Sequence, residues 1–129
     1  MNLADLVERV KRHPDFRKAG MVLCHNGVVR ETPGSGCQPP GSGGGLVDHL
    51  VVKVDHAKLA EVVARHKRMP GIIEILAEIA EGRKLSVGDD IMMLVVAGDV
   101  RTNVIPVMTS LIDEIKATVT GKTEVRRND

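Results

Sequence analysis

Residues 88–115 read GDDIMMLVVAGDVRTNVIPVMTSLIDEI and predict a turn, a buried strand and a helix in immediate succession. Residues 91–97 form an almost continuous apolar run, which is typical of a strand covered on both faces. Apolar residues then recur at helical spacing from Val104 to Ile115. Pro106 is compatible with this helix only in its first turn, where a missing N–H costs no hydrogen bond.

The flanking segments predict further helices and strands, one of them ambiguous. Patterns of apolar and β-forming residues predict a helix over 3–10 that Asn2 can cap, a helix that Asp55 can cap and Pro70 ends, and strands over 20–29 and 46–54. Gly27 indicates a bulge or a close backbone approach inside its strand. Residues 72–80 fit a strand and a helix equally well because the run is short. We expect Gly121 to end the last helix and residues 122–126 to form a short strand.

The order of these elements predicts one α+β domain with a mixed or mostly antiparallel sheet and three helices. A length of 129 residues fits a single domain, residues 1–129. Residues 32–45, TPGSGCQPPGSGGG, consist almost entirely of Gly, Pro and Ser. Such a composition does not support packed structure, so we predict a mobile loop inside the domain.

Composition argues against several classes of partner. The net charge of +1 gives no global field that would attract nucleic acid or a membrane. The chain has one Phe and neither Tyr nor Trp, which excludes an aromatic surface for stacking single-stranded bases. No apolar run approaches the ~20 residues that a membrane span needs. The N-terminus is polar and does not resemble a signal peptide, so we expect a cytoplasmic protein.

The histidines and cysteines do not form a recognisable ligand pattern. The five histidines are scattered without metal-ligand spacing, so we predict no metal site and no cofactor. Cys24 and His25 are adjacent in a predicted strand, where their side chains point to opposite faces. We interpret Cys24 as a small buried apolar residue, and Cys24 and Cys37 as free thiols. The sequence Gly121-Lys122-Thr123 lacks the earlier Gly and the following helix of a phosphate-binding loop.

Basic residues cluster around the predicted last helix. Arg101 follows the buried strand directly, Lys116 lies in the last turn of the helix, and Lys122 comes just after it. Most surface cations are simply solvated, and cations near a helix C-terminus interact favourably with its dipole. Taken alone, these residues therefore indicate no function.

Several stretches resemble the large, catalytic subunit of molybdopterin synthase. Residues 20–30, GMVLCHNGVVR, are similar to the first strand of that family, which begins with Gly, reaches a second Gly and ends in Arg. Residues 85–91, LSVGDDI, are similar to its Leu-x-x-Gly-Glu/Asp-x-Ile/Val turn. Residues 101–116 align with its long helix without a gap. Lys122 with Glu124 fits the family's final Lys-x-Glu after one deletion.

The resemblance implies a fold, a reaction and a set of site residues. Members add two sulfurs to cyclic pyranopterin monophosphate and so form molybdopterin. The sulfur comes from a small ubiquitin-like subunit with a C-terminal Gly-Gly thiocarboxylate, and two large subunits form a homodimer. Arg30 and Arg101 are thereby expected to bind the phosphate or the tail, because Arg offers a bidentate fork. Lys116 and Lys122 are expected to form the catalytic pair, which shuttles protons or holds a covalent intermediate.

Two other functions stay open, because the chain departs from the family pattern. Val100 stands where members usually have a His before the Arg, and Gly121 stands in place of a Trp. One alternative is a non-catalytic relative that acts as a binding or regulatory module with the same dimer fold. The other is a protein that binds a different phosphorylated small molecule.

Overall fold

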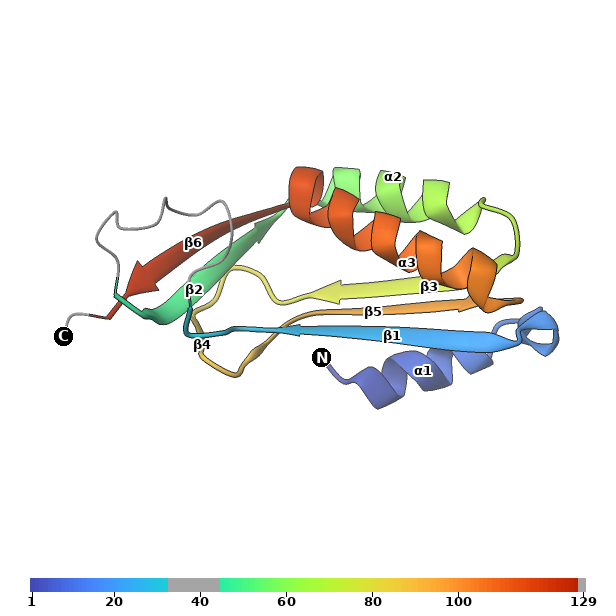
Figure 1. Ribbon diagram of the computed structural model, residues 1–129, viewed down its shortest axis with the longest axis horizontal. Coiled ribbons are helices and arrows are strands. Elements are labelled where there is room, and N and C mark those ends of the chain that lie inside the picture. The colour runs from blue at the N-terminus through green and yellow to red at the C-terminus, as the bar shows by residue number, and fades with distance from the viewer. Residues whose placement is uncertain (33–44, 128–129) are drawn as a thin grey trace.

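The computed structural model describes residues 1–32 and 45–127, and it has the expected α+β architecture with three helices (Figure 1). The helices are α1 (Leu3–Lys11), α2 (His56–Lys67) and α3 (Arg101–Glu114), with a 3-10 turn at Phe16–Lys18 and a π-helical turn at Ile115–Val119. The strands are β1 (Met21–Val28), β2 (Val47–Val54), β3 (Ile72–Ile79), β4 (Leu85–Ser86), β5 (Asp90–Gly98) and β6 (Thr120–Arg126).

The strands form two three-stranded sheets, and every pairing is antiparallel. One sheet has the order β1-β5-β3, and the other has the order β4-β2-β6. Figure 1 shows α2 and α3 on one face of the first sheet and α1 on its other face. In the same view, β2 and β6 extend away from the end of α3. The predicted mostly antiparallel sheet is thus confirmed, although it is divided into two.

Strand β5 is the centre of the molecule, as its apolar sequence predicted. Alternate residues of a strand point to opposite faces of the sheet. In β5, the residues of one face are covered by α2 and α3, and those of the other face by α1. Met92, Leu94 and Val96 pack with the cluster that contains α3. Met93, Val95 and Ala97 pack with Leu6 and Val10 of α1. Because both faces are covered, residues 92–98 are all buried, and the polar alternation of a one-sided strand is absent.

The ambiguous run at residues 72–80 is a strand. β3 pairs with β5 along its whole length, from Ile72 opposite Gly98 to Ile79 opposite Met92. Local pattern could not decide between helix and strand, because both put apolar residues on a buried face. Pairing with the buried neighbour β5 decides it, since the backbone groups on that edge need partners.

The two predicted helix starts have side-chain caps. Asn2 Oδ1 accepts hydrogen bonds from the N–H groups of Ala4 and Asp5, at 2.9 and 3.3 Å. Asp55 Oδ1 accepts a hydrogen bond from the N–H of Lys58 at 3.0 Å. Each cap satisfies N–H groups that the first helical turn leaves without partners.

The start and the end of α3 differ from the prediction. The helix begins at Arg101 rather than at the first apolar residue, so Pro106 lies in its second turn and removes one internal hydrogen bond. The N-cap residue Val100 makes no side-chain capping hydrogen bond. Asp99 Oδ1, just before the helix, accepts hydrogen bonds from Val100 N and Asn103 Nδ2. Gly121 does not end the helix: the π-helical turn does, and Gly121 already lies in β6.

Cys24 is exposed, so its interpretation as a buried residue was wrong. Cys24 belongs to β1 and lies opposite Val95 of β5. Among the described strands, β1 is an edge strand whose single neighbour is β5. The predicted opposite orientation of Cys24 and His25 fits this register. Cys24 is a free thiol, whereas Cys37 and most of the predicted loop at 32–45 fall outside the described residues.

Within the described part of the chain, no helix is long and apolar enough to cross a membrane.

Candidate functional site

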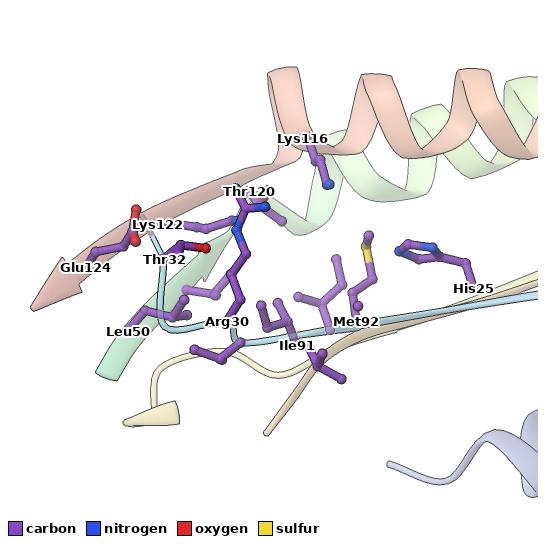
Figure 2. Close-up of a pocket in the computed structure, with 15 residues that line it drawn as sticks. His25, Arg30, Thr32, Leu50, Ile91, Met92, Lys116, Thr120, Lys122 and Glu124 are labelled. Atoms are coloured by element: carbon purple, nitrogen blue, oxygen red, sulfur yellow. The ribbon is translucent and has the colours of Figure 1, made fainter. Parts of the chain in front are cut away.

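A pocket of about 680 Å³ lies where β6 leaves the end of α3, between the two sheets (Figure 2). This volume lies within the range usual for sites that bind small molecules. Its walls come from β1 and the residues after it, from β2 and β6, from the ends of β3 and β5, and from the π-helical turn. The lining residues are His25, Gly27, Val28, Val29, Arg30, Thr32, Leu50, Val52, Ile79, Ile91, Met92, Lys116, Thr120, Lys122 and Glu124.

The apolar lining belongs to the second core of the molecule. Leu50 and Val52 are buried residues of β2 and pack in one cluster with Val29. Ile79 and Ile91 are partly buried and pack against the same cluster. These side chains give the pocket a fixed apolar surface, against which polar groups can be positioned.

Arg30 follows Val29, a buried residue that is hydrogen-bonded to the turn before β5. Val29 is 2% exposed, donates a hydrogen bond to Asp89 O at 2.9 Å and accepts one from Gly88 N at 2.8 Å. The register of β1 against β5 shifts between Gly27 and Val28, so the predicted irregularity at Gly27 is present. The extra residue at this shift is Ile91 of β5, which has no counterpart on β1 between Gly27 and Val28.

Lys122 lies on β6, which places alternate residues towards the pocket. Thr120, Lys122 and Glu124 all line it, as expected for positions two residues apart on a strand. Lys122 lies opposite Val52, and Glu124 lies opposite Leu50. The side chain of Lys122 therefore lies beside Leu50 and Val52, the apolar residues of β2 that line the pocket.

Lys116 reaches the pocket from the π-helical turn after α3. Ile115 and Val119 of this turn are buried, at 0% and 4% exposure, and anchor it to the core. Figure 2 shows the ammonium of Lys116 directed from the helix end towards the pocket. π-Helical turns occur often at functional sites, because the wider turn changes the direction of the side chains it carries.

His25 lines the pocket at the end away from Glu124, close to Met92 (Figure 2). Its Nε2 atom is buried and has no hydrogen-bond partner in the described part of the chain. Partial burial lowers the pKa of the imidazole below its usual value, and the ammonium of Lys116 lowers it further. Both effects favour the neutral form of the imidazole.

Three cations and one carboxylate thus meet in one pocket. Arg30, Lys116 and Lys122 supply the positive charges, and Glu124 supplies the negative one. An excess of positive charge above an apolar floor is suited to a ligand with an anionic group and a less polar body. Arg30, Lys116 and Lys122 come from distant parts of the chain, and the fold brings these three of the four expected site residues to one pocket.

Arg101 is not part of this pocket. It is the first residue of α3, whereas Lys116 follows the last. With 14 residues, α3 is roughly 21 Å long at the usual rise per residue. The fold therefore separates Arg101 from the other predicted site residues of the same chain.

The sequence of this chain matches the model of a known protein family. The family model described as MoaE protein matches residues 1–118. The chain belongs to the MoaE family. Membership places it in molybdenum cofactor biosynthesis, and the resemblance noted in the sequence is thereby confirmed.

Solved structures share the fold of this MoaE family member. Molybdopterin cofactor biosynthesis protein E from Burkholderia multivorans is 22% identical, with a TM-score of 0.73 over 98% of this chain and 82% of that one. Molybdopterin synthase from Staphylococcus aureus is 21% identical, with a TM-score of 0.68 over 89% and 79%. A subunit in the complex of subunits 1 and 2 of molybdopterin-converting factor from Helicobacter pylori is 15% identical, with a TM-score of 0.69 over 100% and 82%. No curated protein matches the chain significantly.

Sequence reasoning missed His25, Thr32 and Glu124 as pocket residues. Glu124 could have been found, because it is two residues from Lys122 on a predicted strand. His25 had a weaker signal: it shares a strand face with Gly27 and precedes Arg30 by five residues. The described residues contain no group of three or more His, Cys, Asp or Glu side chains that could hold a metal ion.

Proposed function

We propose that this protein is the sulfur-transferring subunit of a molybdopterin synthase. It would convert cyclic pyranopterin monophosphate into molybdopterin with sulfur from the thiocarboxylate of a small partner subunit. The single observation that carries this proposal is the meeting of Arg30, Lys116 and Lys122 around one pocket, in a chain of the MoaE family.

The chemistry of these cations suits both reactants. The cyclic phosphate and the thiocarboxylate are anionic, and both need positive charge in a site partly withdrawn from water. Arg30 would hold the phosphate, since a guanidinium can donate two parallel hydrogen bonds to it. Lys116 and Lys122 would act at the reacting carbon, where a lysine can transfer protons or form a covalent intermediate.

The proposed partner is a small ubiquitin-like subunit that ends in Gly-Gly. Two glycines lack side chains, so such a tail can enter a narrow pocket. The Helicobacter pylori structure contains two subunits of molybdopterin-converting factor, which supports a partner of this kind.

We further propose a homodimer, in which Arg101 of each copy contributes its side chain to the pocket of the other copy. Within one chain, the length of α3 keeps Arg101 away from Lys116 and Lys122. If Arg101 binds the anionic substrate, a second chain must bring it to the site.

The test is reconstitution of the reaction with the small subunit encoded in the same genome. The full-length protein is mixed with cyclic pyranopterin monophosphate and the thiocarboxylated small subunit, and molybdopterin is measured. We expect product with the thiocarboxylate and none with the same subunit carrying an ordinary C-terminal carboxylate. Binding of both reactants without any product would refute the enzyme and favour the non-catalytic binding module.

A further inference from the structure

His25 brings to the pocket a hydrogen-bonding atom that the described protein does not use. Its Nε2 atom is buried and lacks a hydrogen-bond partner, although the residue lines an open pocket. Buried polar atoms in folded proteins are nearly always hydrogen-bonded, because leaving one unpaired costs its full desolvation. An unpaired atom at a pocket wall therefore points to a ligand group as its partner.

Gly27 leaves the space beside this atom open. His25 and Gly27 are two residues apart on β1 and share the face that lines the pocket. A Cβ atom at position 27 would lie 3.4 Å from His25 Nε2. Any other residue at position 27 would place carbon where a hydrogen-bonding ligand atom could approach.

The charges around His25 indicate what kind of ligand atom belongs there. Lys116, from the π-helical turn, is the charged group that acts on the imidazole in the described part of the chain. On the neighbouring strand, Met92 and Leu94 are uncharged, while Arg30 and Lys122 add positive charge to the same pocket. A neutral imidazole beside these cations can donate a hydrogen bond from Nε2 to an anion that they attract.

We propose that His25 is a ligand-binding residue that donates a hydrogen bond from Nε2 to an anionic oxygen held near Lys116. The inference rests on the proposed function for the identity of that oxygen, which belongs either to the phosphate of the small substrate or to the C-terminal carboxylate of the partner's tail. A bound anion offsets the charge of Lys116, so it raises the pKa of His25 towards its usual value.

The experiment follows the imidazole nitrogens of the full-length protein by NMR while a ligand is added. Inorganic phosphate is the first probe, and an acetylated peptide that ends in Gly-Gly is the second. His25→Gln identifies the His25 signals. We expect at least one probe to move the Nε2 signal and to raise the pKa of His25, and the probe that acts identifies the source of the oxygen. The inference is overturned if neither probe moves these signals.

Variants separate this hydrogen bond from general effects on the fold. His25→Leu should weaken binding of the active probe about tenfold, because it removes the donor. His25→Gln, whose amide N–H can replace Nε2–H, should recover most of this loss. Gly27→Ala should weaken binding by filling the adjacent space. His56→Leu is the matched control, since His56 is an exposed residue paired with Glu81 outside the pocket.

The outcomes distinguish this inference from the proposed function. If wild-type protein forms molybdopterin and His25→Leu, shown to be folded by circular dichroism, has unchanged kcat and KM, the inference fails and the function stands. If phosphate moves the His25 signals but the reconstituted protein forms no product, the function fails and the binding role of His25 stands.

Discussion

At the scale of single residues, two lysines reach one pocket from different backbone environments. Lys116 is carried by a π-helical turn with buried residues at both ends, and Lys122 is carried by strand β6. Both side chains line the pocket. Neither supports the core, because both residues are exposed. Their substitution should therefore affect chemistry without affecting the fold.

We predict that Lys122→Ala abolishes molybdopterin formation while the fold and the oligomeric state stay unchanged. Lys116→Ala should lower the rate strongly, on the order of 10²-fold, which is typical for loss of a group that transfers protons. Lys122→Arg should not restore activity, because Arg keeps the charge but does not give up its proton. The measurement is product formation with the thiocarboxylated small subunit. Full activity of Lys122→Ala would remove Lys122 from the catalytic role.

A second prediction concerns Gly98, the last residue of β5. The residue is buried, and a Cβ atom there would lie 2.6 Å from Val104 Cγ2 and 2.8 Å from Gly71 O. The Gly71 oxygen cannot move freely, because it accepts a hydrogen bond from Asp99 N at 2.9 Å. Gly98→Ala should therefore lower the free energy of unfolding by about 1–3 kcal/mol, as overpacked cores do.

Gly121→Ala is the control for this effect. A Cβ atom at Gly121 would meet nothing within 4 Å, and Gly121 is not among the glycines with positive φ. Its substitution should change the free energy of unfolding by less than about 0.5 kcal/mol. Urea denaturation of both variants provides the comparison. Equal stability of the two would show that the strand end can adjust to a methyl group.

At the scale of elements, contacts between α2 and α3 fix the helix end from which Lys116 projects. Arg65 donates hydrogen bonds from Nη1 and Nη2 to the two carboxylate oxygens of Glu114, at 3.0 and 2.7 Å. His66 is fully buried; its Nδ1 lies 2.7 Å from Val62 O and its Nε2 lies 2.9 Å from Ser110 Oγ. Glu114 is the last residue of α3, so this network holds the helix immediately before the π-helical turn.

The third prediction uses the pH dependence of this pair. Hydrogen bonds from Arg65 lower the pKa of Glu114 below its usual value. A carboxylate whose pKa is lower in the folded state than the unfolded value of about 4.3 stabilises the protein above that pH. This contribution is lost as the pH falls through the folded pKa. Glu114→Gln should therefore lower Tm at pH 7, and the difference from wild type should shrink below about pH 4.

Thermal unfolding of both proteins between pH 3 and pH 7 checks this prediction. Asp48, Glu74 and Asp99 also have lowered pKa values, but both proteins share them, so the difference isolates Glu114. A Tm difference that stays constant with pH would show that Glu114 acts through packing rather than through its charge.

At the scale of the whole molecule, both sheets end in strands with an open edge among the described residues. β1 and β3 border the first sheet, and β4 and β6 border the second. Open edges present unpaired backbone groups and favour pairing with another chain. Val28 at the end of β1 is also 49% exposed. We therefore predict a homodimer, and light scattering at micromolar concentration should give twice the chain mass. A monomer mass would count against the dimer and against any role for Arg101 in a second pocket.

Complementation between two inactive variants tests the proposed exchange of Arg101. Arg101→Ala and Lys122→Ala are unfolded together, refolded as a mixture and assayed. Half of the randomly formed dimers contain one copy of each variant. In such a dimer, one of the two pockets has Lys122 from one chain and Arg101 from the other. Roughly a quarter of wild-type activity should therefore return. Each variant refolded alone is the control. If the mixture stays inactive, Arg101 does not complete the site of a second chain.

Local sequence patterns determined most of the elements by themselves. The apolar run of β5 predicted a strand covered on both faces, and the capping residues Asn2 and Asp55 predicted two helix starts. The spacing of Gly20, Gly27 and Arg30, together with the turn and the helix that follow, indicated the family. These features depend on residues close together in the chain, where side-chain period and capping chemistry act directly on the backbone.

Tertiary structure alone decided the features that depend on distant partners. β3 is a strand because β5 lies beside it, and Cys24 is exposed although Val95, which lies opposite it on β5, is buried. The pocket exists because β6 leaves the end of α3 beside β2, which brings Lys122 to Arg30 and Lys116 and leaves Arg101 at the opposite end of the helix. The role proposed for His25 also depends on tertiary structure, since a buried nitrogen can be recognised as unpaired only from its neighbours in the fold.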